Sequence, residues 1–222
     1  MENAVSKSTH VKNWRPQLLV LVDIDAEGHP YSNKLLYCGS QLKKGRGLLQ
    51  FIGLLESNDT NENVADTEKA TRNLQKAVHI WTDSGFANVY VTKNRLHGLH
   101  MAVQSSGIGP LKCNTVLVGW PTRWKTLPEC PMQYTELLRS IISSRKSLMV
   151  LKDKENHFPA NTKRLEGTID VWWLLHDGGL LMLVRSNLKL SFSFLNIMCR
   201  FPTSYNYIKS GEDVNCVFLQ WL

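Results

Sequence analysis

The sequence predicts an α/β fold in which an open parallel sheet is flanked by helices. Short apolar runs alternate with longer amphipathic segments along most of the chain, which is typical of strands joined by crossover helices. The first of these runs is continuously apolar, as expected of a strand buried on both faces. Hydrophobic residues make up 43% of the 222 residues and charged residues 20%. This composition indicates a globular chain, and we expect a doubly wound sheet.

Six segments have the composition of strands. The first, residues 17–22 (QLLVLV), follows a proline, and residues 86–92 (FANVYVT) are rich in β-branched and aromatic side chains. The other four are residues 47–57, 114–120, 146–153 and 168–176. We expect all six to follow the alternating pattern of a parallel sheet.

Four helical patterns fall between the expected strands, at residues 33–42, 64–84, 96–106 and 132–144. The longest opens with Asp66 and Glu68 and is followed by Gly85. Acidic residues in the first turn and a glycine beyond the last turn are the usual signals of a helix start and stop.

Charge and hydropathy exclude some functions and leave others open. The net charge of +7 suits phosphates, nucleic acid or an anionic membrane face without choosing among them. No nucleic-acid-binding motif is present, so we predict no nucleic-acid partner. The sequence has no run of 18 apolar residues, so we expect no membrane-spanning segment, and the polar start does not resemble a signal peptide.

The cysteine and histidine patterns predict neither disulfides nor a metal site. The five cysteines are odd in number and form no CxxC pair, so we expect reduced thiols in a cytosolic setting. His97 and His100 lie three residues apart, a spacing compatible with a metal-binding helix face. Without a second ligand group we regard that spacing as chance.

A basic glycine-containing turn, SQLKKGRGL at residues 40–48, is the strongest candidate for ligand binding. Lys43, Lys44 and Arg46 supply positive charge, while Gly45 and Gly47 allow the backbone to approach a ligand closely. The segment matches neither the Walker A nor the GxGxxG pattern. From the pattern alone, a solvated basic turn is the favoured interpretation.

The small-residue turn SSGIGP at residues 105–110 has two interpretations. Such turns lie at the carboxyl ends of the strands in a doubly wound sheet, where ligands bind. The segment could also be a helix cap with Gly107 in the left-handed conformation, and we favour the cap.

The segment GWPTRWK at residues 119–125 combines aromatic and basic side chains. Trp120 and Trp124, with Arg123 and Lys125, could stack on a nucleotide base or face a protein partner. Exposed aromatic residues beside basic ones often mark partner surfaces, so we predict an interface formed by Trp120, Arg123 and Trp124.

The segment TIDVWWLLHDGG at residues 168–179 places His176 beside Asp177. A catalytic role would need a nucleophile that this base and acid could activate, and no GxSxG motif is present. The HDGG run also has the composition of a turn, in which Asp177 caps the chain and the glycines adopt positive φ. We therefore predict a structural role and no enzymatic activity.

Four segments together resemble the C-terminal cytosolic domain of cation–chloride cotransporters, and the potassium–chloride branch most closely. They are VKNWRPQLLVLV at 11–22, SQLKKGRGL at 40–48, QSSGIGPLKCNTVLVGWP at 104–121 and GTIDVWWLLHDGGLLMLV at 167–184. The landmarks occur in the same order as in the family. Their combination is specific, although each motif alone is weak.

The resemblance implies a fold like that of universal stress proteins, on the cytoplasmic side of the membrane beneath twelve transmembrane helices of the same transporter. It implies homodimer contacts and regulation of potassium and chloride symport, while the 168–179 segment crosses the core and has no catalytic role. It also implies that ATP or ADP binds through Lys43, Lys44 and Arg46, beside the Gly45 and Gly47 backbone. Lys44 stands where alanine is common in the family, and Arg46 where lysine is common.

The resemblance suggests three parts of the chain. Residues 1–13 form a flexible N-terminal segment, residues 14–184 the regulatory α/β domain, and residues 185–222 a divergent tail that does not align with the family's second half-domain. The sequence by itself also allows a stand-alone soluble nucleotide-binding protein of the universal-stress type.

Overall fold

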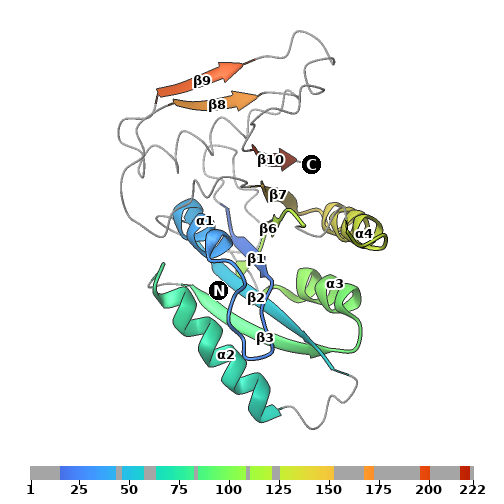
Figure 1. Cartoon of the computed structure of the whole chain (residues 1–222). Helices are drawn as coiled ribbons and strands as arrows, with labels where there is room; N and C mark the ends of the chain where they lie inside the picture. The colour runs from blue at the N-terminus through green and yellow to red at the C-terminus, as the bar shows by residue number, and fades with distance from the viewer. Residues whose placement is uncertain are drawn as a thin grey trace, which may run out of the picture.

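The computed structural model describes residues 16–43, 47–57, 64–82, 85–108, 111–121 and 126–152, with three later strands at 168–172, 196–200 and 216–220. The main sheet has six strands in the order β10-β7-β6-β1-β2-β3 (Figure 1). Neighbouring strands from β7 to β3 are parallel, and β10 is antiparallel to β7. The strands are β1 Leu18–Val22, β2 Leu49–Glu56, β3 Phe86–Thr92, β6 Thr115–Gly119, β7 Ser147–Lys152 and β10 Cys216–Gln220.

Helices cover both faces of the sheet, as Figure 1 shows for α1 (Lys34–Lys43) and α2 (Val64–His79) against α3 (Arg95–Ser105) and α4 (Cys130–Ser143). The predicted open parallel sheet flanked by helices is therefore confirmed. None of the helices in the described ranges is both long and apolar enough to cross a lipid bilayer.

The central strand β1 explains the continuous apolar run in the sequence. Its even-numbered residues, such as Val20, belong to the core beneath α1 and α2, and Leu19 and Leu21 belong to the core beneath α3 and α4. All five residues of β1 are buried. Burying one such aliphatic side chain stabilises the fold by roughly 1.5–3 kcal/mol, so both faces of β1 favour its central position.

Helix α2 ends earlier than the sequence predicts. The expected helix ran to residue 84, but α2 ends at His79 and a turn follows. The backbone N–H groups of Trp81 and Thr82 both donate to the carbonyl of Val78, at 2.9 and 3.0 Å. The Trp81 ring contacts Tyr37 edge-on, with ring centroids 5.4 Å apart. This tryptophan makes its tertiary contact from the turn, outside the helix, and the helix ends before it.

The predicted SSGIGP turn overlaps a small antiparallel hairpin that the sequence analysis did not predict, formed by β4 (Gly107–Ile108) and β5 (Leu111–Lys112). Gly107 has φ 102°, the positive value that the cap interpretation required. The alternative interpretation, in which this turn lies at the carboxyl ends of the strands, is wrong. The turn follows α3 and precedes β6, so it lies at the amino end of a parallel strand.

The sixth predicted strand does not join the main sheet. Strand β8 (Thr168–Trp172) pairs in parallel with β9 (Asn196–Arg200) in a separate two-stranded sheet, and β10 takes the place beside β7. A parallel neighbour of β7 would need a crossover that packs back onto the sheet, and the polar segment 153–167 has no helical pattern in its sequence. His176 and Asp177 lie outside the described residues.

Candidate functional site

The sequence candidates fall at opposite ends of the parallel strands. Leu18 is opposite Leu49 and Thr115, and Thr115 is opposite Ser147, so four strands begin at the same end of the sheet. The basic turn at 43–47 precedes β2 and lies at this amino end. The segment that begins with Trp120 follows β6 and lies at the carboxyl end.

The two described residues of the basic turn at 43–47, Lys43 and Gly47, both lie close to the rest of the fold. Lys43, the last residue of α1, is only 9% exposed, and burial lowers the pKa of its ammonium group. Gly47 has φ 142°, and a Cβ atom there would lie 3.0 Å from the carbonyl oxygen of Pro16. Lys44, Gly45 and Arg46 lie outside the described residues.

The position of Lys43 at a helix C-terminus decides how a phosphate could bind there. The C-terminal end of a helix carries partial negative charge, which favours a lysine and disfavours an anion. A phosphate at this turn would therefore depend on the side-chain charges of Lys43, Lys44 and Arg46. The predicted nucleotide contact of this turn stays a prediction.

Gln17 and Asn114 join the starts of four strands in one hydrogen-bond network. The Gln17 N–H donates to Asn114 Oδ1 at 2.8 Å, and the Gln17 carbonyl accepts from the Asn114 N–H at 3.0 Å. Gln17 Oε1 also accepts from the Leu48 N–H, and the Asn114 carbonyl accepts from the Ser147 N–H at 2.8 Å. These contacts link the chain at the starts of β1, β2, β6 and β7.

Lys146 closes the same end of the sheet beside the small hairpin. Its Nζ donates to Ser106 Oγ at 3.0 Å and to the carbonyl of Cys113 at 2.7 Å. Burial lowers the pKa of Lys146 and raises that of the Cys113 thiol. Because the ammonium group is held between buried acceptors, its role here is structural.

The sequence predicts that Gln17 and Asn114 begin two strands, but it indicates no role for either side chain. The two residues are 97 positions apart, and only the sheet order brings them together. A signal was present, since each polar residue directly precedes a buried apolar strand. That signal does not reveal which strand starts are neighbours.

At the carboxyl end, Trp120 packs against two neighbours. Its ring contacts Tyr134 of α4 edge-on, with centroids 6.0 Å apart, and Lys152 Nζ lies 4.9 Å from a Trp120 ring centroid. Apolar side chains are exposed nearby in the chain, Leu127 by 47% and Met132 by 69%. Arg123 and Trp124 lie outside the described residues, so only Trp120 of the predicted interface is placed.

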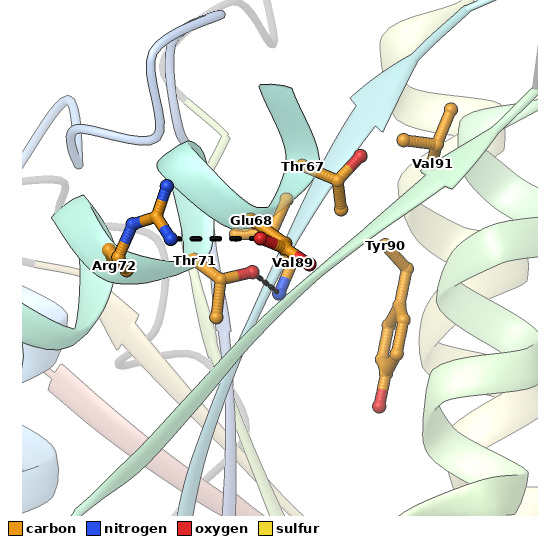
Figure 2. A pocket seen from close by; sticks show the side chains of 7 residues that line it. All are labelled: Thr67, Glu68, Thr71, Arg72, Val89, Tyr90 and Val91. Atoms are coloured by element: carbon orange, nitrogen blue, oxygen red, sulfur yellow. Dashed lines mark hydrogen bonds and ion pairs between the residues drawn. The ribbon is translucent and has the colours of Figure 1, made fainter. Parts of the chain in front are cut away.

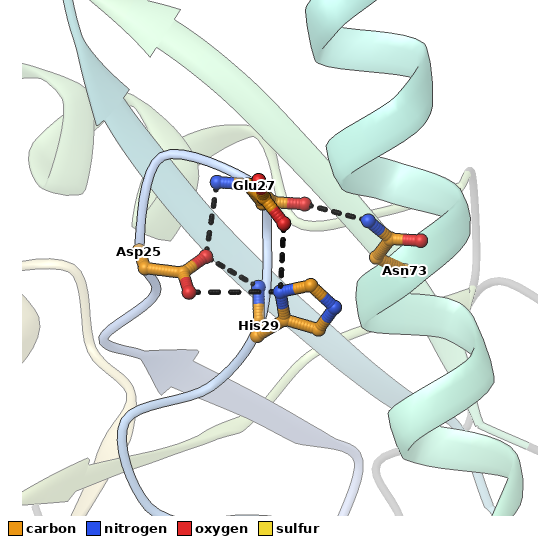
Figure 3. A network of polar contacts seen from close by, with 4 residues as sticks. All are labelled: Asp25, Glu27, His29 and Asn73. Atoms are coloured by element: carbon orange, nitrogen blue, oxygen red, sulfur yellow. Dashed lines mark hydrogen bonds and ion pairs between the residues drawn. The ribbon is translucent and has the colours of Figure 1, made fainter.

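The loop after β1 is held by Asp25 (Figure 3). Its Oδ1 accepts from the backbone N–H groups of His29 at 2.8 Å and Glu27 at 2.9 Å, and the bond from His29 is the main cause that lowers the pKa of Asp25. The His29 ring nitrogen Nδ1 lies 3.5 Å from Asp25 Oδ2 and 3.7 Å from Glu27 Oε2. Asn73 Nδ2 donates to the Glu27 carbonyl at 2.9 Å, which fastens the loop to α2.

This polar loop does not have the ligand set of a metal centre. The part of the chain that the structure describes contains no group of three histidine, cysteine or acidic side chains that could hold a metal ion. A Cβ atom on Gly28 would lie 2.3 Å from the carbonyl oxygen of Ala70, so the loop approaches α2 too closely for any other residue. The loop contacts therefore serve to position the chain.

Two open grooves run along the edge strand β3, away from the predicted sites. The larger, of about 450 Å³, lies between β3 and α2 (Figure 2). On its rim Arg72 and Glu68 form an ion pair at 3.6 Å, and Thr71 Oγ1 accepts from the Val89 N–H at 3.2 Å. A smaller groove of about 260 Å³ lies between β3 and α3. Both grooves are lined in part by Tyr90, which is 42% exposed.

A model of solute carrier family 12 (SLC12) matches residues 33–158, which is more than half of the chain. The chain belongs to solute carrier family 12. The matched range includes all four flanking helices and the predicted basic turn and Trp120 segment. Strand β1 and Gln17 lie before it.

Among solved structures, the SLC12 chain is similar to the "cytoplasmic domain of a prokaryotic cation chloride cotransporter", with 15% sequence identity and a TM-score of 0.48. The alignment covers 84% of this chain and 66% of that chain. The SLC12 chain thus spans less than two thirds of the length of that protein.

Proposed function

We propose that this chain is a cytoplasmic regulatory domain of a potassium–chloride cotransporter. Membership of solute carrier family 12, shown by the match over residues 33–158, is the observation that carries the proposal. The matched range is an α/β unit with helices on both faces, and the sequence landmarks at 40–48 and 104–121 favour the potassium–chloride branch. The domain acts by binding and without catalysis.

The surface around Trp120 is the proposed contact with the membrane part of the same transporter. Trp120 lies after β6, and Leu127 and Met132 expose apolar surface at the same end of the sheet. The interface predicted from the sequence also includes Arg123 and Trp124, which lie outside the described residues and would add a positive charge and a second indole. Aromatic and arginine side chains of this kind are enriched where binding energy concentrates.

Transport assays test this contact directly. In a cotransporter that contains this chain, Leu127→Asp with Met132→Asp should reduce rubidium uptake severalfold, since two charges enter an apolar contact. The matched control is Ile80→Asp with Phe86→Asp, which changes side chains exposed by 75% and 62% at the opposite end of the sheet.

Both double variants should reach the cell surface in equal amounts. Equal uptake in the two would contradict the contact at Trp120. Rubidium takes the place of potassium in this assay, so rubidium uptake that persists when chloride is omitted would contradict the coupling of the two ions. If both double variants still form dimers, the proposed homodimer contact lies elsewhere on the domain.

Nucleotide binding at the basic turn is a second proposal. Three cations and two glycines fall within residues 43–47, and the resemblance assigns ATP or ADP to Lys43, Lys44, Gly45, Arg46 and Gly47. Lys44→Ala with Arg46→Ala should weaken ATP binding at least tenfold, as measured by calorimetry. Lys43 is kept in this variant because it is buried and its replacement would affect folding.

Lys69→Ala with Arg72→Ala, which removes two cations from the exposed face of α2, is the charge-matched control for nucleotide binding. Equal ATP affinity in the two double variants would contradict a site at the basic turn. Fractionation separates the wider alternatives, because a stand-alone universal-stress-type protein stays soluble whereas the transporter domain sediments with membranes.

A further inference from the structure

The two lateral edges of the main sheet are closed in different ways. At the β3 edge, side chains of α2 bind the backbone groups that a further strand would use. Gln75 Oε1 accepts from the Ala87 N–H at 2.7 Å, and Gln75 Nε2 donates to the Gly85 carbonyl at 2.9 Å. One helical turn earlier, Thr71 Oγ1 accepts from the Val89 N–H at 3.2 Å (Figure 2).

These contacts form a side-chain ladder along the edge strand. Thr71 and Gln75 are four residues apart and lie on one face of α2, while Ala87 and Val89 are two residues apart on β3. The ladder occupies N–H groups that an incoming strand would need. Unpaired edge groups are the usual template for strand addition, so the ladder closes the stretch of this edge from Ala87 to Val89.

The opposite edge is closed by a strand. The five residues of β10 pair antiparallel with β7, from Cys216 opposite Lys152 to Gln220 opposite Leu148. Among the six strands of the main sheet, β10 alone is antiparallel to its neighbour. Its sequence, CVFLQ, contains no charge, no proline and no glycine.

The β7 edge has the features of an acceptor for such a strand. Its four central residues, Leu148 to Leu151, are all 5% exposed or less, so β7 belongs to the core although it lies one strand from the edge. The element contacts of β10 are concentrated on β7. Main-chain pairing beside a core strand accepts an extended apolar segment and places few demands on its sequence.

We propose that the β7 edge is a strand-acceptor site that binds an extended apolar segment antiparallel to β7. In this chain the occupant is its own segment Cys216–Gln220. By filling the site within the same molecule, this segment prevents strand-mediated association with a second copy. The segment Cys216–Gln220 thus blocks strand addition at the β7 edge, as the side-chain ladder of α2 does at the β3 edge.

A single substitution tests whether the segment Cys216–Gln220 of the same chain occupies the strand-acceptor site. The register places the native Cys216 opposite Lys152, so Lys152→Cys creates a cross-strand cysteine pair, and such pairs are close enough for a disulfide. Leu151→Cys is the matched control, because Leu151 is opposite Val217 and its side chain points to the other face of the sheet.

Mild oxidation and peptide mapping by mass spectrometry should find a disulfide within one chain between the introduced thiol of the Lys152→Cys variant and Cys216. The Leu151→Cys variant should form no disulfide with Cys216. A link between two chains would overturn occupancy by the chain's own segment. Equal cross-linking in both variants, or none in either, would overturn the pairing itself.

The capping role is tested by removing N–H groups with which β10 binds β7. The Ser147 N–H and the Leu151 carbonyl bind the chain at the ends of β6, so Leu148, Val150 and Lys152 are the residues of β7 that face β10. Their partners across the ladder are Gln220, Phe218 and Cys216.

Phe218→Pro with Gln220→Pro should therefore give oligomers larger than those of the wild type in light scattering after gel filtration. Val217→Pro with Leu219→Pro is the matched control, because these N–H groups point away from β7, and it should behave as the wild type does. An unchanged mass for the Phe218→Pro, Gln220→Pro variant would overturn the proposal. If that variant loses its helical circular dichroism signal, the Lys152→Cys result decides.

Discussion

The amino and carboxyl ends of the parallel strands differ in how their polar groups are used. At the amino end, Gln17, Asn114 and Lys146 bind backbone and side-chain groups of the protein itself. At the carboxyl end, Asp23 pairs with Arg95 while 75% of its side chain stays exposed, and apolar side chains such as Met132 are in contact with solvent.

This difference indicates which end maintains the sheet and which end is available to partners. The polar groups at the amino end are satisfied within the fold, so removing one leaves another buried and without its hydrogen bond. Exposed pairs at the carboxyl end contribute little to stability and can be altered at small cost. Mutations at the two ends should therefore differ in their effect on unfolding.

The largest effect is expected from Asn114→Ala at the amino end. The substitution removes the acceptor for the Gln17 N–H and the Thr115 hydroxyl, and we expect a loss of about 2–3 kcal/mol in unfolding free energy. Asn94→Ala at the carboxyl end removes one exposed helix cap to the His97 N–H and should cost about 1 kcal/mol. Denaturant unfolding compares the two, and equal losses would contradict the difference between the ends.

Lys146→Met should lower the unfolding free energy by about 1–2 kcal/mol, since Ser106 and the Cys113 carbonyl both lose a charged donor. Combining it with Ser106→Ala should cost less than the sum of the two single substitutions, because the second removes a partner that the first has already lost. Strictly additive losses would show that the Lys146–Ser106 bond contributes nothing.

Arg145→Gly should stabilise the protein by about 1 kcal/mol. Arg145 follows α4 with φ 53°, and its N–H and that of Lys146 donate to the carbonyls of Ile142 and Ile141 in a Schellman motif. Arg145→Ala is the control, since it removes the charge but keeps the Cβ atom that disfavours positive φ. A thermal unfolding gain in the alanine variant equal to that in the glycine variant would refute this explanation.

The smallest effect is expected from Asp25→Asn at the carboxyl end. The folded-state pKa of Asp25 is lowered, so its stabilisation is present above the unfolded-state pKa and is lost as pH falls through the folded-state pKa. The variant should be less stable by below about 1 kcal/mol at neutral pH, because solvent screens this exposed group. Unfolding at neutral and acidic pH should show this difference shrinking in acid, and a constant difference would contradict it.

Most of the fold could be predicted because the decisive signals are local. The run at 17–22 predicted β1, and the acidic start of α2 was visible in Asp66. The end of α2 was missed because Trp81 leaves the helix to contact Tyr37, which is distant in sequence. The tail strand β10 was missed because its sequence does not reveal that it pairs with β7, which is distant in the chain.

Less of the candidate site could be predicted. Composition located the basic turn and Trp120, whereas the roles of Gln17, Asn114 and Lys146 depend on which strands become neighbours. A polar residue before a strand has the same appearance in the sequence whether it binds solvent, a ligand or another strand. The order of the strands decides among these, and the order is a property of the whole chain.

The geometry of the side-chain ladder between α2 and β3 limits the length of edge strand that such a ladder can protect. A helix advances about 6.0 Å in four residues, whereas a strand advances about 6.6 Å in two. The offset between helix side chains and strand N–H groups therefore grows by about 0.6 Å with each successive pair. After a few pairs the donor and acceptor are too far apart for a hydrogen bond. Side chains of one helix can therefore bind the backbone N–H groups of a short edge such as Ala87 to Val89. On a longer edge strand they would no longer reach these groups, so selection at this edge should favour short strands.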